Sequence, residues 1–538
     1  MFDLIHVPIV PFFLYAETHY KFKGIYSRLF KKQPEIIADA PLRVEPGQAI
    51  PILILVKDAH RFPIEILEVI IEIKQFGRLL TKHSFVLNLL VDRDPFWQRI
   101  FYLERPAEAS GLVAIDVQIV IKWHGKICIY HNDNYRISSH LPLEVFLSDH
   151  DWPKFDNWYF GDFHYHSNYT EDQVEFGAPL SATVAMARAL GLDFVAVTDH
   201  SYDLDDHEGL WVRNDPALNK WRKFRAEVEA FNSNREEIVV LPGEEVSVGN
   251  SRHRNIHLLV IDHPEFLPGQ GDSAERWFHT WPDLPLTTIL ERLHPQALAI
   301  AGHPEMATPF LQWLLIRRGD WEVSDLGLSR LDGFQIWNGE FDRSFHHGSA
   351  KWVKLLLAGS RLSLIAGNDA HGNFNRFRQI GFPFFTFREG NFQRFGMMRT
   401  GVCIEGDANR SSIIQAVKSH RTLVTSGPII DMMVHNTQND KATIGSEISG
   451  EELLLHVRAK STPEFGRLKS LKIYRGDLVE KKEKLEIQCQ NFLNSYSLQW
   501  EQRIIESSNS SYLRAELVTQ TNAGAEHRCL TSPIWISN

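Results

Sequence analysis

Two histidines separated by one residue, His164 and His166, follow Asp162 closely in the chain. Successive side chains of a β-strand alternate between faces, so these three are expected on one side of a strand. Two imidazoles at this spacing can chelate one divalent cation, and Asp162 is placed to orient an imidazole through its second ring nitrogen. An H-x-H pair alone is weak support for a metal site, because two ordinary histidines would produce the same pattern.

Further histidines and acids stand where short apolar runs end, or within them. They are Asp199 and His200, Glu244 and Glu245, His257, His303, Asp369 and His371. In (β/α) barrels the carboxyl ends of the strands meet at one mouth, where active sites are built. So many coincidences are poorly explained by isolated core histidines, and they indicate one shared centre.

The residue types in this set indicate the chemistry. Mixed imidazole and carboxylate ligands suit zinc, manganese or iron, whereas calcium and magnesium prefer oxygen ligands. Closely spaced ions of this kind lower the pKa of a bound water and polarise a scissile group. Ser167 follows His166 but lacks the setting of a serine nucleophile. The residues therefore predict a metal-dependent hydrolase that uses an activated hydroxide.

The order H-x-H, T-D-H, G-E-E, a strand histidine, G-H-P and D-A-H resembles the PHP (polymerase and histidinol phosphatase) domain. The resemblance covers residues 158–427, and the passage from 413 to 428 is similar to the carbaryl-hydrolase-like branch. It implies a distorted (β/α)7 barrel, TIM-barrel-like in its layout, that holds two or three divalent metal ions. It also implies a phosphoesterase that acts on a phosphomonoester or a phosphodiester.

The resemblance also assigns roles to individual residues. Glu245, His200 and Asp369 take catalytic roles, and Asp162 and Asp199 orient the ligands. Glu171 stands where relatives commonly have aspartate, so Asp172 remains an alternative to it. Gln335 stands where relatives often have glutamate and is left out of the ligand set. The implied metal ligands are His164, His166, Glu171, His200, Glu245, His257, His303, Asp369 and His371.

Four residues are predicted to bind an anionic small-molecule substrate: Arg376, Arg378, Arg254 and His346. Arginine side chains can bind a phosphate oxygen through two parallel hydrogen bonds. The long connection from residue 262 to 285 could cover the site. Two other readings stay open: hydrolysis of a carbamate, ester or amide at the same metal site, and a non-catalytic metal-binding scaffold.

The elements around the site predict an α/β fold with β-rich flanks. Residues 1–40 form an N-terminal extension, and residues 41–150 carry Ile- and Val-rich runs typical of a β-sandwich-like domain. In residues 158–427, short apolar strands alternate with helical stretches, as in βα units. Residues 428–538 return to strand-like runs and predict a second small β domain.

Bulk composition limits the remaining possibilities. The 538 residues have a formal net charge of -10, which argues against a large nucleic-acid interface. The four cysteines form no C-x-x-C pair, which suits a reducing compartment. Pro8 and Pro11 interrupt the apolar N-terminus, so a signal peptide is disfavoured and no membrane span is expected. We therefore expect a cytoplasmic protein, with the oligomeric state left open.

Overall fold

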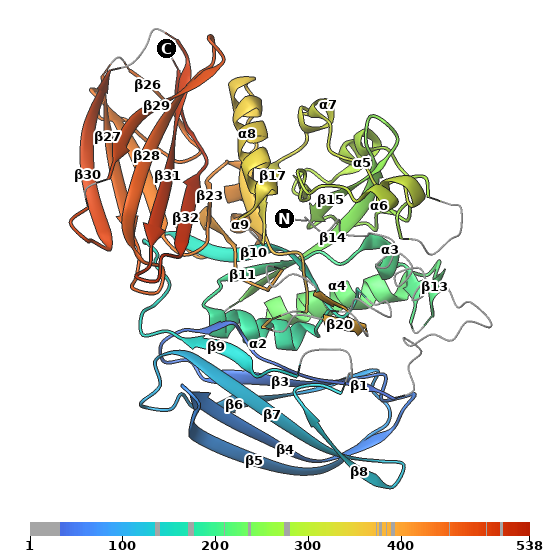
Figure 1. The fold of residues 1–538 in the computed structure, drawn as a ribbon. Helices are drawn as coiled ribbons and strands as arrows, with labels where there is room; N and C mark the ends of the chain where they lie inside the picture. Colours follow the sequence, from blue (N-terminus) through green and yellow to red (C-terminus); the bar gives the residue numbers. More distant parts are fainter. Residues whose placement is uncertain are drawn as a thin grey trace.

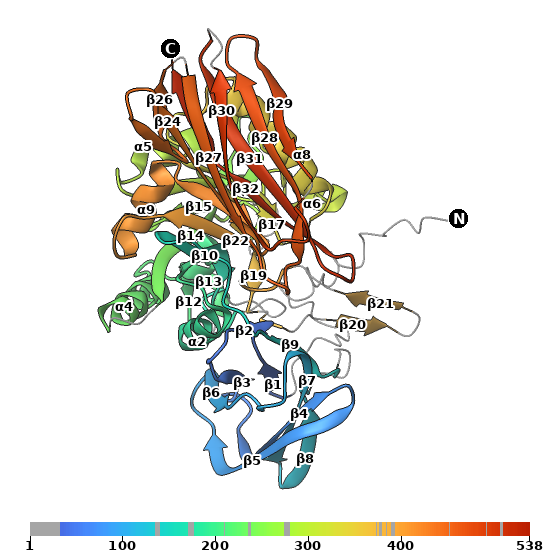
Figure 2. The ribbon, with the colours of Figure 1, turned by 90° about the vertical axis from the view of Figure 1, so that its left-hand side faces the viewer.

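The computed structural model describes most of the chain, and everything below refers to those residues. They are 33–134, 140–170, 177–208, 210–234, 238–273, 280–339, 341–372, 374–375, 379–382, 385–388, 393–450, 452–490, 492–505 and 509–537. Figures 1 and 2 show a β-rich N-terminal region below, a mixed α/β region in the middle and a second β-rich region above. Within these residues, no helix combines the length and the apolar character needed to cross a membrane.

Two sheets form the N-terminal region. One has the order β1-β3-β6, and the other has the order β2-β9-β7-β4-β5, with β8 paired to β7. In β4, buried Ile66, Ile71 and Ile73 alternate with partly exposed acidic and basic residues, so one face of the strand enters the core. The strands are β1 (Glu35–Asp39), β2 (Arg43–Val44), β3 (Ile50–Lys57), β4 (Ile64–Gln75), β5 (Arg78–Val91), β6 (Phe96–Leu103), β7 (Gly111–Trp123), β8 (Lys126–His131) and β9 (Leu143–Leu147).

The middle region supplies every side chain of the candidate site. Its strands are β10 (Trp158–His166), β11 (Phe194–Val197), β12 (Asp206–His207), β13 (Leu210–Asn214), β14 (Val239–Gly249), β15 (Asn255–Ile261), β16 (Leu298–Ala301), β17 (Gly333–Asn338), β18 (Ser363–Gly367), β19 (Ala370–His371), β20 (Gln379–Phe382), β21 (Phe385–Arg388), β22 (Arg399–Cys403) and β23 (Thr422–Thr425). Its helices are α2 (Leu180–Leu190), α3 (Ser201–Leu204), α4 (Asn219–Ser233), α5 (Leu286–Arg292), α6 (Phe310–Leu315), α7 (Val323–Leu326), α8 (Arg343–Leu357) and α9 (Arg410–Lys418).

Most strands of this region lie in one mixed sheet, in the order β18-β17-β16-β15-β14-β11-β10-β22-β23, and β19 pairs with β10. Two further pairs, β12 with β13 and β20 with β21, form separate two-stranded sheets. The pairs β10/β11, β11/β14, β16/β17 and β17/β18 are parallel. β15 is antiparallel to both β14 and β16, and β22 is antiparallel to β10. Apolar residues pack between the sheet and the helices, as Phe224 of α4 does beside Val240 of β14.

The predicted distorted (β/α)7 barrel is wrong. Among the described residues the strands follow an open, mixed path rather than a closed ring of parallel strands. Residues 250–254 alone join β14 to β15, which is too short for the crossover that two parallel neighbours require. Alternating apolar runs look the same in a hairpin and in successive βα units, because the periodicity of a strand does not record its direction.

The C-terminal strands continue the same sheet. β32 pairs with β23 of the middle region and leads on to β31, β28 and β29. A separate sheet, β25-β24-β27-β30, packs on these strands through an apolar core that includes Met432, Leu455 and Leu517. The strands are β24 (Ile429–Asn436), β25 (Lys441–Thr443), β26 (Glu447–Ser449), β27 (Glu452–Lys460), β28 (Arg467–Asp477), β29 (Lys482–Cys489), β30 (Ser497–Ile505), β31 (Ser511–Gln520), β32 (Glu526–Thr531) and β33 (Ile534–Ser537).

Candidate metal centre

Eight histidine and acidic side chains from neighbouring strands meet at one edge of the mixed sheet. β10 carries two of them, and β14, β15 and β19 carry one each. The remaining three, His200, His303 and Asp369, lie two or three residues beyond the ends of β11, β16 and β18. They form three overlapping groups whose potential ligand atoms lie within 4.8 Å of one another. The eight are His164, His166, His200, Glu245, His257, His303, Asp369 and His371.

The first group is the most regular. The Nε2 atoms of His164 and His166 lie 3.2 Å apart. Each of them lies 3.3 Å from Oε2 of Glu245 and 3.2 Å from Oδ1 of Asp369. An ion held tetrahedrally by bonds of about 2.0–2.1 Å has ligand atoms roughly 3.3–3.4 Å apart. These four atoms therefore have the spacing of one tetrahedral coordination shell.

Glu245 links this group to the second. Its other oxygen, Oε1, lies 3.1 Å from Nε2 of His303 and also contacts Nδ1 of His257. The carboxylate thus presents one oxygen to each group, as a bridging ligand does. His257 and His303 are both buried, and their rings meet edge to face.

The third group contains His166, His200 and His371. The rings of His166 and His371 are stacked with centroids 4.1 Å apart, and His200 lies 4.4 Å from His166. Nδ1 of His200 is also 3.1 Å from Oε2 of Glu245. Three imidazoles and a nearby carboxylate suit the same transition metals as the other two groups.

The electrostatics of the centre favour bound positive charge. Burial lowers the pKa of His166, but its ion pairs with Asp369 and Glu245 outweigh burial and raise that pKa to about 10. Burial and the neighbouring charge of His166 lower the pKa of His200 to about 4. Burial alone would raise the pKa of Glu245, yet the surrounding histidines hold it well below its usual value. A divalent ion would replace the protons that the histidines share.

The backbone is specialised where the ligands converge. A Cβ atom on Gly367 would lie 2.5 Å from Cβ of His164, so only glycine permits β18 to approach β10 here. His303 and Asp369 adopt positive φ angles of 27° and 52°. Such angles are uncommon for residues with a Cβ and cost of order 1 kcal/mol or more each, and they cluster at functional sites. The fold therefore keeps these two side chains in place at a local energetic cost.

Asp162 does not orient an imidazole, contrary to prediction. Its carboxylate accepts hydrogen bonds from the backbone of His164, from Asn368 and from the backbone of Gly396. The pairing of β10 with β11 shifts register between Asp162 and Tyr165, and such an irregularity changes which way the side chains point. Asp162 therefore holds β10 against the segment that follows β18, and it does not hold a ligand ring.

Asp199 acts on the ligands indirectly. Its two carboxylate oxygens accept hydrogen bonds from Ser167 and from the backbone of Thr170. The hydroxyl of Thr170 in turn lies 3.2 Å from Nδ1 of His166. Asp199 thus holds the turn that positions His166, and Ser167 has the structural role that its sequence context indicates.

Two of the four predicted substrate-binding residues, Arg254 and His346, have partners outside the centre. The guanidinium of Arg254 stacks on the Trp313 ring at 4.1 Å. The ring of His346 contacts Phe341 and Phe345 at the start of α8. Arg376 and Arg378 lie outside the described residues, as do the candidate ligand Glu171 and its alternative Asp172. The predicted anion binding by Arg254 and His346 is therefore not supported by their contacts.

Three residues beside the centre were not predicted to act there. Oε1 of Gln335 lies 3.0 Å from Nδ1 of His164 and accepts a hydrogen bond from the backbone of His303. Asp272 and Arg318 both contact His257. Gln335 carried a signal, since it stands at a position where the resemblance expected an acid. The other two lie in loops, where no periodicity marks them.

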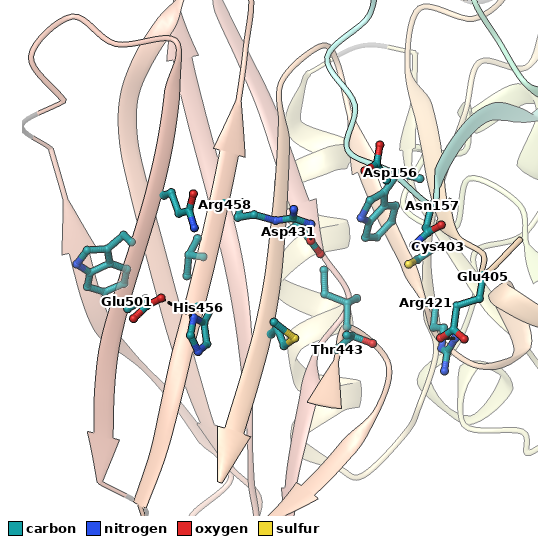
Figure 3. Close-up of a pocket in the computed structure, with 16 residues that line it drawn as sticks. Asp156, Asn157, Cys403, Glu405, Arg421, Asp431, Thr443, His456, Arg458 and Glu501 are labelled. Atoms are coloured by element: carbon teal, nitrogen blue, oxygen red, sulfur yellow. Dashed lines mark hydrogen bonds and ion pairs between the residues drawn. The ribbon is translucent and has the colours of Figure 1, made fainter. Parts of the chain in front are cut away.

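A separate cavity of about 400 Å³ lies between the sheet of β24, β27 and β30 and the segment before β10 (Figure 3). Apart from Asp156, its acidic, basic and histidine side chains are engaged with one another in three pairs: Asp431–Arg458 at 2.6 Å, His456–Glu501 at 3.0 Å and Arg421–Glu405 at 3.4 Å. Because these paired groups neutralise each other's charge, we interpret the cavity as a polar part of the interface between the middle and C-terminal strands.

Comparisons with known proteins give no family. No protein-family model matches the chain, and no curated protein matches it. Similar solved structures include a glycosyl hydrolase family 2 member from Bacteroides cellulosilyticus, with 10% identity and a TM-score of 0.18 over 94% of this chain and 63% of that one. Another is a β-glucuronidase from Parabacteroides merdae, with 10% identity and a TM-score of 0.19 over 94% of this chain and 64% of that one.

The chain thus spans less than two thirds of the length of these two proteins. At such TM-scores the likeness carries no argument about fold or activity. The predicted membership of the PHP family, in its carbaryl-hydrolase-like branch, is nevertheless wrong, because no family model matches the chain and the described strands do not close into the barrel that the family implies. The phosphoesterase activity and the TIM-barrel-like fold that this resemblance implied are withdrawn with it.

Proposed function

We propose that this chain is a metal-dependent hydrolase that holds two or three divalent ions of zinc, manganese or iron in the centre described above. The observation that carries the proposal is the spacing of the first group, in which five of the distances between four ligand atoms are 3.2–3.3 Å. Hydrogen bonds cannot join all four of these atoms when the rings are neutral, because each ring has only one N–H donor and the carboxylate oxygens only accept. A shared cation satisfies all four atoms.

Different residues of the chain would have different roles in this centre. Glu245 would bridge the first two groups and fix their separation through its two oxygens. Gln335 and Thr170 hold the outer nitrogens of His164 and His166, which keeps the inner nitrogens turned to the centre. When bound, divalent ions supply a nucleophile at neutral pH by lowering the pKa of water, and they polarise the bond to be cleaved.

We infer that the substrate is a small molecule with an uncharged ester, amide or carbamate group. A small cavity of about 40 Å³, room for about one small group, opens beside His257 and His303. Arg318 is the one arginine or lysine among the described residues lining it, and Asp272 already neutralises this side chain at 2.7 Å. A carbonyl group can enter such a cavity without bringing a net charge that lacks a partner.

The test begins with metal analysis of the purified protein and continues with hydrolysis assays after loading with Zn²⁺ or Mn²⁺. The substrates are p-nitrophenyl acetate, an aryl carbamate, an anilide and p-nitrophenyl phosphate. We expect at least two ions per chain and turnover of a carbonyl substrate that His164→Ala abolishes. His346→Ala is a matched control outside the centre and should retain activity.

Two results would overturn the proposal. Less than one bound ion per chain would remove the metal centre. Full occupancy without turnover of any of the four substrates would instead favour a metal-binding scaffold.

A further inference from the structure

The orientation of His257 is set from both sides of its ring. Its Nδ1 atom contacts Oε1 of Glu245, the bridging carboxylate. Its Nε2 atom lies 3.0 Å from Oδ2 of Asp272, in the long connection between β15 and α5. One nitrogen therefore faces the metal centre, and the other faces a carboxylate that belongs to none of the three ligand groups.

Asp272 is itself held rigidly. Its carboxylate is almost fully buried, with 3% of the side chain exposed. Ser247 of β14 donates its hydroxyl hydrogen to Oδ1, and Arg318 donates from Nη1 to Oδ2 at 2.7 Å. Because Ser247 is paired directly with His257 across the β14–β15 hairpin, the donor and the ring share one rigid element.

Arg318 lies against both nitrogens of the ring, and its Nη1 atom contacts Nε2. Its Nη2 atom lies 3.1 Å from Nδ1 of His257. A guanidinium can only donate and an ionised carboxylate can only accept. Asp272 therefore requires hydrogen on Nε2, which leaves the lone pair of the neutral ring on Nδ1, the nitrogen beside Oε1 of Glu245. Arg318 contacts both nitrogens and selects neither tautomer.

We propose that Asp272 is a positioning residue: it fixes the tautomer and rotation of His257 so that the lone pair of Nδ1 faces the ion shared with Glu245, and it holds Arg318 at the rim of the cavity beside His303. This inference rests on the proposed metal-dependent function. Carboxylates that accept from the outer nitrogen of a metal-bound imidazole typically change metal affinity 10- to 100-fold when removed.

The experiment measures metal binding directly, so it needs no turnover. Wild type, Asp272→Ala, Asp272→Asn, Asp272→Glu and Asp283→Asn are titrated with Zn²⁺ against a chromophoric chelator. Asp283 is the matched control, because it lies in the same connection and accepts a hydrogen bond from the backbone of Gln270 rather than from a ligand. Circular dichroism checks that each variant is folded.

We expect Asp272→Ala to bind one ion per chain about 10- to 100-fold more weakly while the other ions keep wild-type affinity. Asp272→Asn should show a smaller loss in the same direction, Asp272→Glu should recover part of it, and Asp283→Asn should match wild type. In ¹⁵N-histidine spectra of the zinc-loaded protein, the Nε2–H signal of His257 should shift in Asp272→Asn. It should stay in place in Asp272→Glu and in Asp283→Asn.

Wild-type affinity in folded Asp272→Ala or Asp272→Asn would overturn the inference and leave the metal centre standing. Equal losses in Asp272→Asn and Asp283→Asn would show that the connection acts only as a structural cover. A wild-type chain that binds no Zn²⁺ would overturn the proposed function first, and the inference with it.

Discussion

Glu245 and Glu244 are neighbours in β14 with opposite roles, which makes Glu→Gln at each position a matched test. Oε2 of Glu245 lies 3.1–3.3 Å from nitrogens of His164, His166 and His200, and Oε1 faces the second group. Gln keeps the shape of the side chain but removes the charge and replaces one acceptor oxygen with a donor. Both metal groups would therefore lose a ligand at once.

The size of the effect follows from this double contact. Removing one group that stabilises the transition state costs about 10²–10³-fold in kcat. Since Glu245 serves two groups, we expect Glu245→Gln to lower kcat by at least about 10³-fold, or ~4 kcal/mol of activation free energy. We also expect the variant to retain at least one ion fewer per chain.

Glu244 points away from the centre and accepts hydrogen bonds from Trp221 Nε1 at 2.8 Å and from the backbone of Leu267 at 3.2 Å. Burial raises the pKa of Glu244 to about 7, from a usual value of 4.5. Its contribution to stability is therefore fully present below pH 4.5 and is lost as the pH rises through about 7. Glu244→Gln should gain stability relative to wild type between pH 4.5 and pH 8, by at most about 3 kcal/mol, because the amide does not ionise. At pH 4.5 it should be less stable than wild type, because its amide NH2 group cannot accept from one of the two N–H donors.

The assays are metal content per chain, kcat at saturating substrate, and urea unfolding at pH 4.5 and pH 8. Glu244→Gln should keep both its ions and its kcat. The reasoning is refuted if Glu245→Gln keeps wild-type metal content, or if the two variants lose activity equally. The second result would mean that β14 as a whole, rather than the bridging carboxylate, carries the effect.

Three further predictions concern the surroundings of the ligands. Gly367→Ala should destabilise the protein by about 1–3 kcal/mol in urea unfolding and lower its metal content, because the new Cβ would overlap His164. Gln335→Leu should weaken metal binding about 10-fold or more in a chelator competition, because His164 loses the partner of its outer nitrogen. Removing the ions with a chelator should abolish hydrolysis and lower the melting temperature, and Zn²⁺ or Mn²⁺ should restore both, since a ligand of the folded state stabilises it.

The residues of the candidate centre could be predicted from their types and from their positions at or near strand ends. The eight described residues expected as ligands do meet in the structure, although their role in metal binding stays a prediction. Asp272 and Arg318 could not be found in this way. They are 15 and 61 residues from His257, and only the tertiary path of two loops brings them to it. A hydrogen-bond partner supplied by a loop leaves no periodic trace in the sequence.

The strand pairing was harder to predict than the site. Closure into a barrel depends on the direction of every strand, and β15 and β22 run opposite to the expected direction. The continuation of the middle sheet through β23 into β32 was equally hidden, because their pairing joins residues about a hundred positions apart. Local patterns report burial and periodicity, whereas such pairings are decided by packing over long separations.

The centre could nevertheless assemble without a barrel, because convergence needs only that β10, β11, β14, β15 and β16 be neighbours and that β18 and β19 approach β10. In parallel strands the ligands must come from the carboxyl ends, as His200 and His303 do. In an antiparallel strand the same edge of the sheet is reached near the strand's beginning, which is where His257 lies in β15. Its cross-strand partner is Ser247, two residues beyond Glu245. The hairpin therefore places His257 beside both the bridging carboxylate and the hydroxyl that holds Asp272, an arrangement that a parallel neighbour starting at the opposite edge would not provide.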